Sequence, residues 1–193
     1  MQYKVTLLSL LMITLYACSG IAPPPKQNWL EQKSALSRIE NWQLNGKIAV
    51  QTLKDSGSAT ITWIKRGDRY SLTLLGPLGT NGLTLNGQRG EVILQMADGK
   101  TYRANNPEQL LKTLWGFELP VSYLVYWVRA LPVPNKPYKE QFDDRNRLIQ
   151  LQQEGWNITF QSYTSIGMVM LPTKILITSP YLKTKMIIYQ WLI

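Results

Sequence analysis

Histidine is absent from this chain, and cysteine occurs only once, at Cys18. Histidine is the commonest general base and metal ligand in proteins, and zinc and iron–sulfur sites depend on histidine and cysteine together. The only adjacent acidic pair, Asp143 and Asp144, would point to opposite faces of an extended segment and could not share a reaction. The sequence therefore predicts a protein that is not an enzyme, with no catalytic residue, metal site or cofactor.

A long apolar run is lacking as well. After Lys4 the apolar residues extend only to Ala17, whereas a membrane-spanning helix needs about 20. A basic start, a short apolar stretch and a small residue before the break are typical of a secretory signal peptide. The segment Leu15-Tyr16-Ala17-Cys18 is similar to a bacterial lipobox, where the peptide is cut before the cysteine and the cysteine is acylated. An ordinary signal peptide followed by a buried thiol is the alternative.

These features divide the chain into three predicted segments. Residues 1–17 are expected to form the lipoprotein signal peptide, and residues 18–27 the lipidated N-terminus with Cys18 as the lipid attachment site. The three prolines after Ala22 favour a stiff, extended linker that would hold a folded domain away from a membrane. Residues 28–193 are expected to fold as one domain.

Acidic residues are few: 12 Asp and Glu stand against 21 Lys and Arg. A basic excess favours an anionic partner, such as nucleic acid, a membrane surface or an acidic protein. For a protein anchored outside the cytoplasm we expect no nucleic acid, and anionic lipid headgroups or an acidic carrier protein fit better. A basic surface with no specific partner is the alternative.

From Trp42 onward, apolar and polar residues alternate, which is typical of half-buried strands. Turn signals separate the alternating runs at Gly67-Asp68, Asn86-Gly87 and Asp98-Gly99. Residues 42–104 are therefore predicted to form about six antiparallel strands with one apolar face.

Helical signals precede and follow these strands. A helix is predicted from Asn28 to Glu40, and a second begins at Asn106-Pro107-Glu108 and stops at Gly116. The spacing of Leu124, Trp127, Val128 and Leu131 predicts a third after Pro120. The remaining strands are predicted at 148–154, 156–163, 171–179 and 185–193. A long sheet with one apolar face must curl, and helices in its concavity would cover it.

The segment around Pro77, Leu78 and Gly79 is rich in glycine but is no phosphate-binding loop, because it joins two strands and contains no lysine. Leu78 would lie near the tip of this turn with no polar residue to shield it. An exposed leucine on a hairpin usually has no special role. The functional alternative is an apolar finger that enters a bilayer or a partner.

Tryptophan is plentiful on the predicted strands and central helices, for example at Trp63, Trp127 and Trp156. Large aromatic residues usually build a core. A concave sheet lined by these residues together with leucines such as Leu72 and Leu124 could equally hold acyl chains in an apolar pocket.

In their order and spacing, several motifs resemble the family of the outer-membrane lipoprotein receptor LolB. The resemblance covers most of the chain after Cys18. The residues that carry it are Trp42-x-Leu44-x-Gly46-Lys47-Ile48-Ala49, Trp63, Gly76-Pro77-Leu78-Gly79, Asn106-Pro107-Glu108-x-Leu110-Leu111, Leu119-Pro120, Leu124-x-x-Trp127-Val128, Leu131-Pro132, Gln153-x-Gly155-Trp156, Leu171-Pro172 and Trp191.

The resemblance implies a mainly β fold with helices: an incomplete, open antiparallel β-barrel wrapped around short helices, enclosing an apolar cavity. It implies a monomeric receptor that accepts acylated lipoproteins from a LolA-like periplasmic carrier and inserts them into the inner leaflet of the outer membrane. Leu78, with Pro77 and Gly79, matches the family's membrane-insertion loop. Trp63, Trp127 and Trp156 match aromatic positions of the barrel and cavity, and we expect Leu72 and Leu124 to join them.

The resemblance also implies an outer-membrane address, lipid-anchored and facing the periplasm. Ser19 is not the aspartate that retains lipoproteins in the inner membrane. Two positions depart from the family pattern: Tyr16 is unusual in a lipobox, and Ala130 stands where the family often has glycine before Leu-Pro.

Three other functions fit parts of the sequence. A lipocalin-like envelope lipoprotein that binds free lipid or another apolar ligand would share the sheet and the pocket but need no carrier. A structural or assembly lipoprotein would use the sheet edge. An envelope hydrolase is disfavoured by the absence of histidine and of a convincing acid pair.

Overall fold

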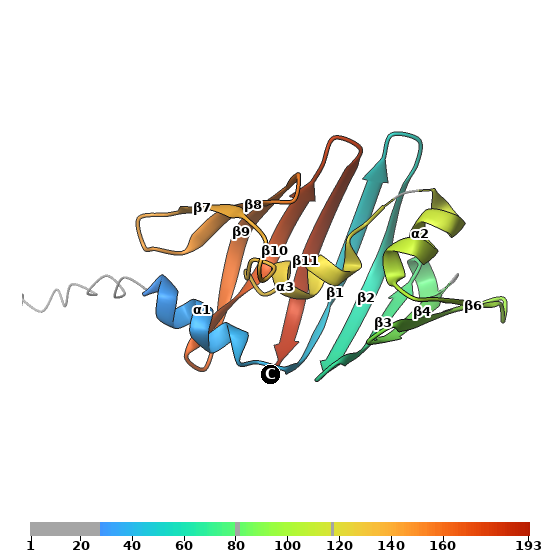
Figure 1. The fold of residues 1–193 in the computed structure, drawn as a ribbon, viewed down its shortest axis with the longest axis horizontal. Coiled ribbons are helices and arrows are strands. Elements are labelled where there is room, and N and C mark those ends of the chain that lie inside the picture. Colours follow the sequence, from blue (N-terminus) through green and yellow to red (C-terminus); the bar gives the residue numbers. More distant parts are fainter. Residues whose placement is uncertain (1–27, 80–81, 117) are drawn as a thin grey trace, which may run out of the picture.

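The computed structural model describes residues 28–79, 82–116 and 118–193. The predicted signal peptide, Cys18 and the linker lie outside these residues. The described chain forms one 11-stranded antiparallel sheet and three short helices (Figure 1). The helices are α1 Trp29–Ser37, α2 Pro107–Trp115 and α3 Val121–Trp127. The strands are β1 Asn41–Thr52, β2 Ser56–Arg66, β3 Arg69–Leu75, β4 Leu83–Gln88, β5 Glu91–Met96, β6 Thr101–Ala104, β7 Tyr138–Phe142, β8 Leu148–Gln153, β9 Trp156–Ile166, β10 Val169–Thr178 and β11 Leu182–Leu192.

The sheet is open, because β6 and β7 form its two edges and do not pair with each other. Its order is β6-β5-β4-β3-β2-β1-β11-β10-β9-β8-β7, so the only neighbours distant in sequence are β1 and β11. The chain between the two edge strands carries α2 and α3, and it crosses the concave face of the sheet (Figure 1). This arrangement confirms the predicted open antiparallel sheet around short helices. No helix among the described residues has the length and apolar character needed to cross a membrane.

Strand β11 shows the alternation that produces the concave core. Leu182, Thr184, Met186 and Ile188 are buried, whereas the residues between them are exposed. A strand turns successive side chains to opposite faces, so the buried set lines one side of the sheet. The period-two pattern that the sequence shows from Trp42 onward thus continues in the burial of the last strand.

A β-bulge marks the seam where β1 pairs with β11. The register shifts between Asn45 and Gly46, and a Cβ atom on Gly46 would lie 2.2 Å from the carbonyl oxygen of Ile187. Only glycine allows this close approach between the two backbones. Because β1 and β11 join the two halves of the sheet, Gly46 is required at a central position.

One predicted turn is wrong. Asn86-Gly87 does not turn the chain, since β4 continues to Gln88 and the turn lies at Arg89-Gly90. Gly87 pairs with Tyr70 on β3, and a Cβ atom there would come within 2.2 Å of the Tyr70 ring. This glycine therefore makes room for a neighbouring aromatic ring.

Helix α2 matches its predicted signals. The Asn106 side chain accepts a hydrogen bond from the backbone N–H of Gln109 at 2.8 Å, and Pro107 occupies the first turn. Gly116 ends the helix in the left-handed region, with φ of 70°.

Helix α3 is shorter than predicted and ends at Trp127 instead of reaching Leu131. The N–H groups of Ala130 and Leu131 donate to the carbonyl oxygens of Trp127 and Tyr126, which is the hydrogen-bond pattern of a Schellman motif. Ala130 takes the left-handed position, with φ of 58°, that glycine usually fills. The apolar spacing continues past the helix because the following turn is also buried.

Strand β7 was not predicted. It forms the edge of the sheet, and most of its side chains are exposed. An exposed edge strand has no buried face to impose a period-two pattern, so no alternation reveals it.

Two buried polar side chains fasten the segment after α3 to its surroundings. Gln153 accepts hydrogen bonds from the Trp127 indole N–H at 3.0 Å and from the Val133 N–H at 2.8 Å. It also donates to the carbonyl oxygens of Val133 and Lys136. Four partners thus tie this segment to β8.

Arg129 fastens the same segment to α1. It is only 5% exposed, and it donates to the carbonyl oxygens of Leu36 and Ile39 at 3.1 and 2.8 Å. Cations favour the C-terminal end of a helix, where carbonyl groups lack partners. Burial lowers the pKa of Arg129, and no carboxylate pairs with it among the described residues.

We predict that Gly46→Ala destabilises the fold by about 1–3 kcal/mol, because the new methyl group collides with the backbone of β11. Gly57→Ala is the control, since a Cβ atom at Gly57 meets nothing within 4 Å. Denaturant unfolding of both variants would measure the difference. Equal losses of stability would refute the role assigned to the close approach.

We predict that Gln153→Leu costs about 3 kcal/mol or more, because the buried Trp127 indole and Val133 backbone groups lose their partner. Gln152→Leu, one residue earlier and exposed, should have little effect. The readout is the free energy of unfolding. A Gln153→Leu variant as stable as the control would contradict this account.

Candidate functional site

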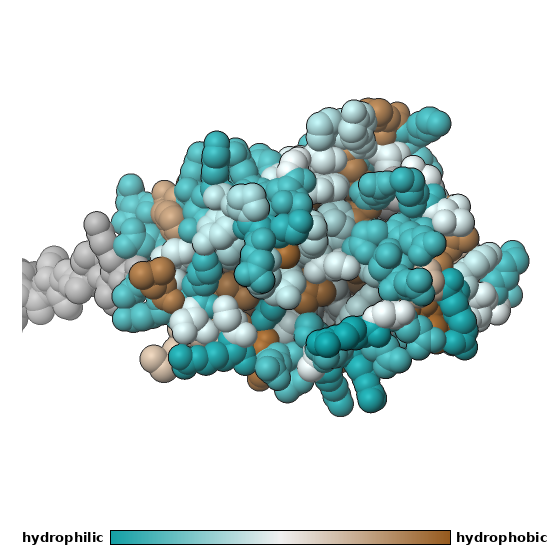
Figure 2. Space-filling model, in the orientation of Figure 1, coloured by the Kyte–Doolittle hydropathy of each residue, from teal (hydrophilic) through white to brown (hydrophobic). Residues whose placement is uncertain are grey.

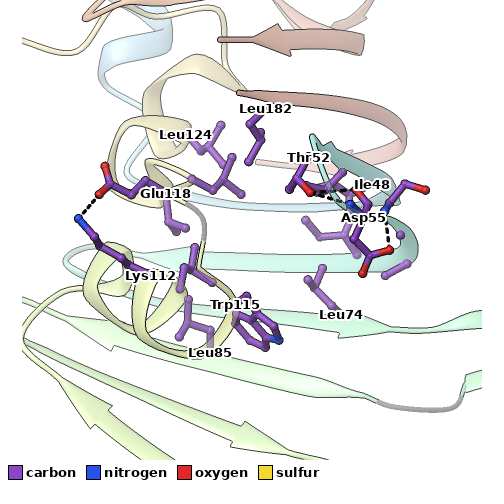
Figure 3. Close-up of a pocket in the computed structure, with 18 of the residues that line it drawn as sticks. Ile48, Thr52, Asp55, Leu74, Leu85, Lys112, Trp115, Glu118, Leu124 and Leu182 are labelled. Carbon is purple, nitrogen blue, oxygen red and sulfur yellow. Dashed lines mark hydrogen bonds and ion pairs between the residues drawn. The ribbon is translucent and has the colours of Figure 1, made fainter. Parts of the chain in front are cut away.

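A large cavity lies on the concave face between the sheet and the two central helices. It has a volume of about 1090 Å³, slightly above the range of about 300–1,000 Å³ common for small-ligand pockets. Its inner wall is built almost entirely of aliphatic and aromatic side chains (Figure 3). These include Ile48, Val50, Ala59, Ile61, Leu74, Leu83, Leu85, Leu94, Leu110, Leu111, Leu119, Val121, Leu182 and Met186. The cavity can therefore hold an apolar guest.

Four hairpin tips form the mouth of the cavity. They are the turns β1–β2, β3–β4, β8–β9 and β10–β11, which contribute Leu53, Pro77, Gly155 and Tyr181 among others. Antiparallel strands return to the same end of the sheet at every second turn, so these tips gather at one end. The C-terminal end of α2 adds Trp115 to the same opening.

Polar groups at the mouth form hydrogen bonds and ion pairs with one another and do not point into the cavity. The Thr52 hydroxyl accepts from the backbone N–H of Asp55 at 3.0 Å, and the Asp55 carboxylate accepts from the N–H of Ser56 at 2.7 Å. Lys112 on α2 and Glu118 form an ion pair at 2.5 Å (Figure 3). The Glu118 contact raises the pKa of Lys112, but both side chains are largely exposed and the pair adds little stability.

The predicted cavity residues occupy different places. Trp63, Leu72, Leu124 and Trp156 line the cavity. Trp127 does not: it is fully buried behind the wall, where its indole donates to Gln153 and its ring packs 6.1 Å from that of Trp156. The helical spacing shows that Trp127 faces inward, but it cannot distinguish a lining residue from one that supports the lining.

The loop of Pro77, Leu78 and Gly79 lies at the mouth, because Gly76 and Pro77 contribute to the cavity rim. The N–H of Gly79 donates to the carbonyl oxygen of Gly76 at 3.0 Å and closes the turn. Leu78 at its tip is fully exposed and has φ of 59°. A leucine in this backbone region costs about 1–2 kcal/mol. Exposing its apolar side chain to water is a second, separate cost, so the turn is unfavourable both for the backbone and for the side chain.

The segment between β6 and β7, which carries α2 and α3, forms the cover of the cavity. The sequence did not reveal the residues that hold this cover in place. Gln153 appears in a motif, but its spacing says nothing about its four hydrogen bonds, and Arg129 carries no signal at all. A polar residue at a buried position of an alternating strand is the one sign that could have indicated Gln153. No group of His, Cys, Asp and Glu in the described part of the chain could hold a metal ion.

Comparison with known proteins assigns the family. The family model described as "Outer membrane lipoprotein LolB" matches residues 40–191. The outer-membrane lipoprotein LolB of Pseudomonas putida is 39% identical, with 86% of this chain and 80% of that protein covered. The LolB proteins of Pseudomonas syringae and Pseudomonas aeruginosa are 37% and 33% identical, covering 94% and 99% of this chain and 92% and 97% of theirs.

Solved structures support the fold. A LolA superfamily protein from Nitrosomonas europaea has a TM-score of 0.54 at 11% identity, covering 88% of this chain and 93% of that one. A lipoprotein-sorting protein domain, described as putative, from Vibrio parahaemolyticus has a TM-score of 0.55 at 7% identity, with 84% and 89% covered. At these identities the likeness concerns the fold alone. From the family match and the relatives together, the chain belongs to the LolB family of outer-membrane lipoproteins, which serves lipoprotein sorting and not catalysis.

Proposed function

We propose that this protein takes the acyl chains of lipoproteins into its cavity and passes them to the outer membrane. The observation that carries the proposal is the apolar cavity of about 1090 Å³ that opens among exposed apolar hairpin tips. Burying one methylene group stabilises a complex by roughly 0.8 kcal/mol, so an acylated protein cannot cross water without such a cover. The cavity provides that cover, and the bilayer, a larger apolar phase, then receives the chains.

The donor of the cargo in this proposal is a LolA-like carrier in the periplasm. Transfer needs no energy source if the chains bind more favourably at each step. The net charge of +9 would speed the encounter with a carrier that has an acidic surface. The protein acts as a monomer, anchored through acylated Cys18 to the periplasmic face of the outer membrane.

The role of the cavity in binding acyl chains is tested by a substitution that reduces its volume. Ala59 on β2 lines the cavity, whereas Thr60 is exposed on the opposite face of the same strand. We predict that Ala59→Trp lowers the affinity for acylated cargo about tenfold or more, because the indole fills space that the chains require. Thr60→Trp should bind like the parent protein.

The measurement is cargo transfer from a loaded LolA-like carrier to each variant in solution, followed by co-purification. Equal transfer to both tryptophan variants would contradict a role for the cavity. A parent protein that binds free fatty acid but takes no cargo from the carrier would instead indicate a lipocalin-like binder.

The loop is tested at Leu78. We predict that Leu78→Glu leaves cargo uptake unchanged and slows release into liposomes about tenfold or more, because a charged side chain cannot enter the acyl region of the bilayer. Met168→Glu is the control, since Met168 is also fully exposed but lies on the β9–β10 turn at the other end of the sheet. Equal release rates for Leu78→Glu and the control would remove the loop from the mechanism.

A further inference from the structure

Two more hairpin tips at the mouth expose large side chains that the Leu78 loop does not account for. Leu53, on the β1–β2 turn, is 78% exposed, and Tyr181, on the β10–β11 turn, is 72% exposed. Thr52 pairs with Leu182 across β1 and β11, so the two turns are neighbours. Both turns stand at the same end of the sheet in Figure 1, and Figure 2 shows a small group of hydrophobic atoms there among pale and hydrophilic ones.

The charges around these tips favour an anionic surface. Three acids line the rim: Glu118 pairs with Lys112, Glu154 pairs with Lys136, and Asp55 forms no ion pair among the described residues and accepts from the backbone N–H of Ser56. Lys54 and Lys183 flank the two tips, and neither forms an ion pair within the described residues. Lysines beside an apolar tip and a tyrosine are the combination found where proteins meet lipid headgroups.

The shape of the rim favours a fluid partner over a protein. Leu53 and Tyr181 belong to separate turns, and a protein interface would need roughly 800 Å² of complementary surface on each side. A bilayer accepts separate side chains without shape complementarity. Tyrosine also suits the interface in particular, because its ring is apolar and its hydroxyl remains hydrated.

We propose that Leu53 and Tyr181 form a second membrane contact beside Leu78, so that the mouth of the cavity is held against an anionic bilayer. The inference rests on the proposed function, in which acyl chains leave the cavity for the membrane. With three tips around one opening in the lipid surface, the chains pass from cavity to bilayer without exposure to water. Leu78 alone would fix a point of contact but not the direction of the mouth.

The contact is measured by site-specific quenching. Cys18 is the only cysteine in the chain and is acylated in the mature lipoprotein, so Leu53→Cys, Tyr181→Cys, Leu78→Cys and Met168→Cys each provide one free thiol for a polarity-sensitive fluorophore. The labelled full-length lipoproteins are reconstituted in vesicles of phosphatidylethanolamine and phosphatidylglycerol with brominated acyl chains. We expect lipid quenching at positions 53, 78 and 181 and none at 168.

Two quenching results would overturn the inference. In the first, the probe at 78 is quenched by lipid, whereas the probes at 53 and 181 remain in water. This result would contradict the second membrane contact but leave the Leu78 contact and the proposed function intact. Probes at 53 and 181 that respond to the carrier but not to lipid would assign the two tips to the carrier.

A functional readout accompanies the quenching. For the double variant Leu53→Ser with Tyr181→Ser, loaded with the same amount of cargo as the parent, we expect release into the same vesicles to slow about tenfold. Met168→Ser should behave as the parent. Release from the double variant at the parental rate would overturn the inference. Failure of the parent itself to take up cargo would refute the proposed function, while quenching at 53 and 181 would still report the membrane contact.

Discussion

The fold depends on one constraint. The apolar concave face of the sheet is too large for the curvature of the sheet alone to shield it from water. Every strand except the edge strand β7 presents residues to that face, and the sheet does not close, because β6 and β7 remain edges. The segment between these edges must therefore supply the cover, and it provides only two short helices. What they leave uncovered is the cavity of about 1090 Å³. The cavity follows from an incomplete cover and needs no specialised pocket residues.

The cover is fixed more firmly at one end than at the other. After α3 it is held by Gln153, through four hydrogen bonds, and by Arg129, which joins it to the end of α1. These groups are buried, so leaving any of them without a partner is expensive. Near α2, Lys112 and Glu118 form an exposed ion pair within the covering segment itself, which water can replace at little cost.

Local sequence patterns predicted the elements that depend mainly on neighbouring residues. Period-two alternation indicated six strands before α2, and a cap with a first-turn proline indicated α2 itself. Strand β7 was missed because an edge strand has no buried face, and α3 was extended too far because the turn at Ala130 is as apolar as the helix. Arg129 could not be identified, since its acceptors lie 93 and 90 residues earlier in the chain. For the same reason, the sequence could not separate Trp127 behind the wall from Trp63 in the lining.

The antiparallel meander also links the cavity to the surface around it. Every second turn returns to the same end, so the turns holding Leu53, Leu78 and Tyr181 surround the mouth. Two turns at the opposite end are polar instead, and Asp68 and Arg89 pair there at 3.5 Å. A single apolar residue on each of these three turns is thus enough to give the mouth an apolar rim. The strands that enclose the cavity also place its opening and its exposed apolar tips on one side, so the two features cannot be separated without changing the topology.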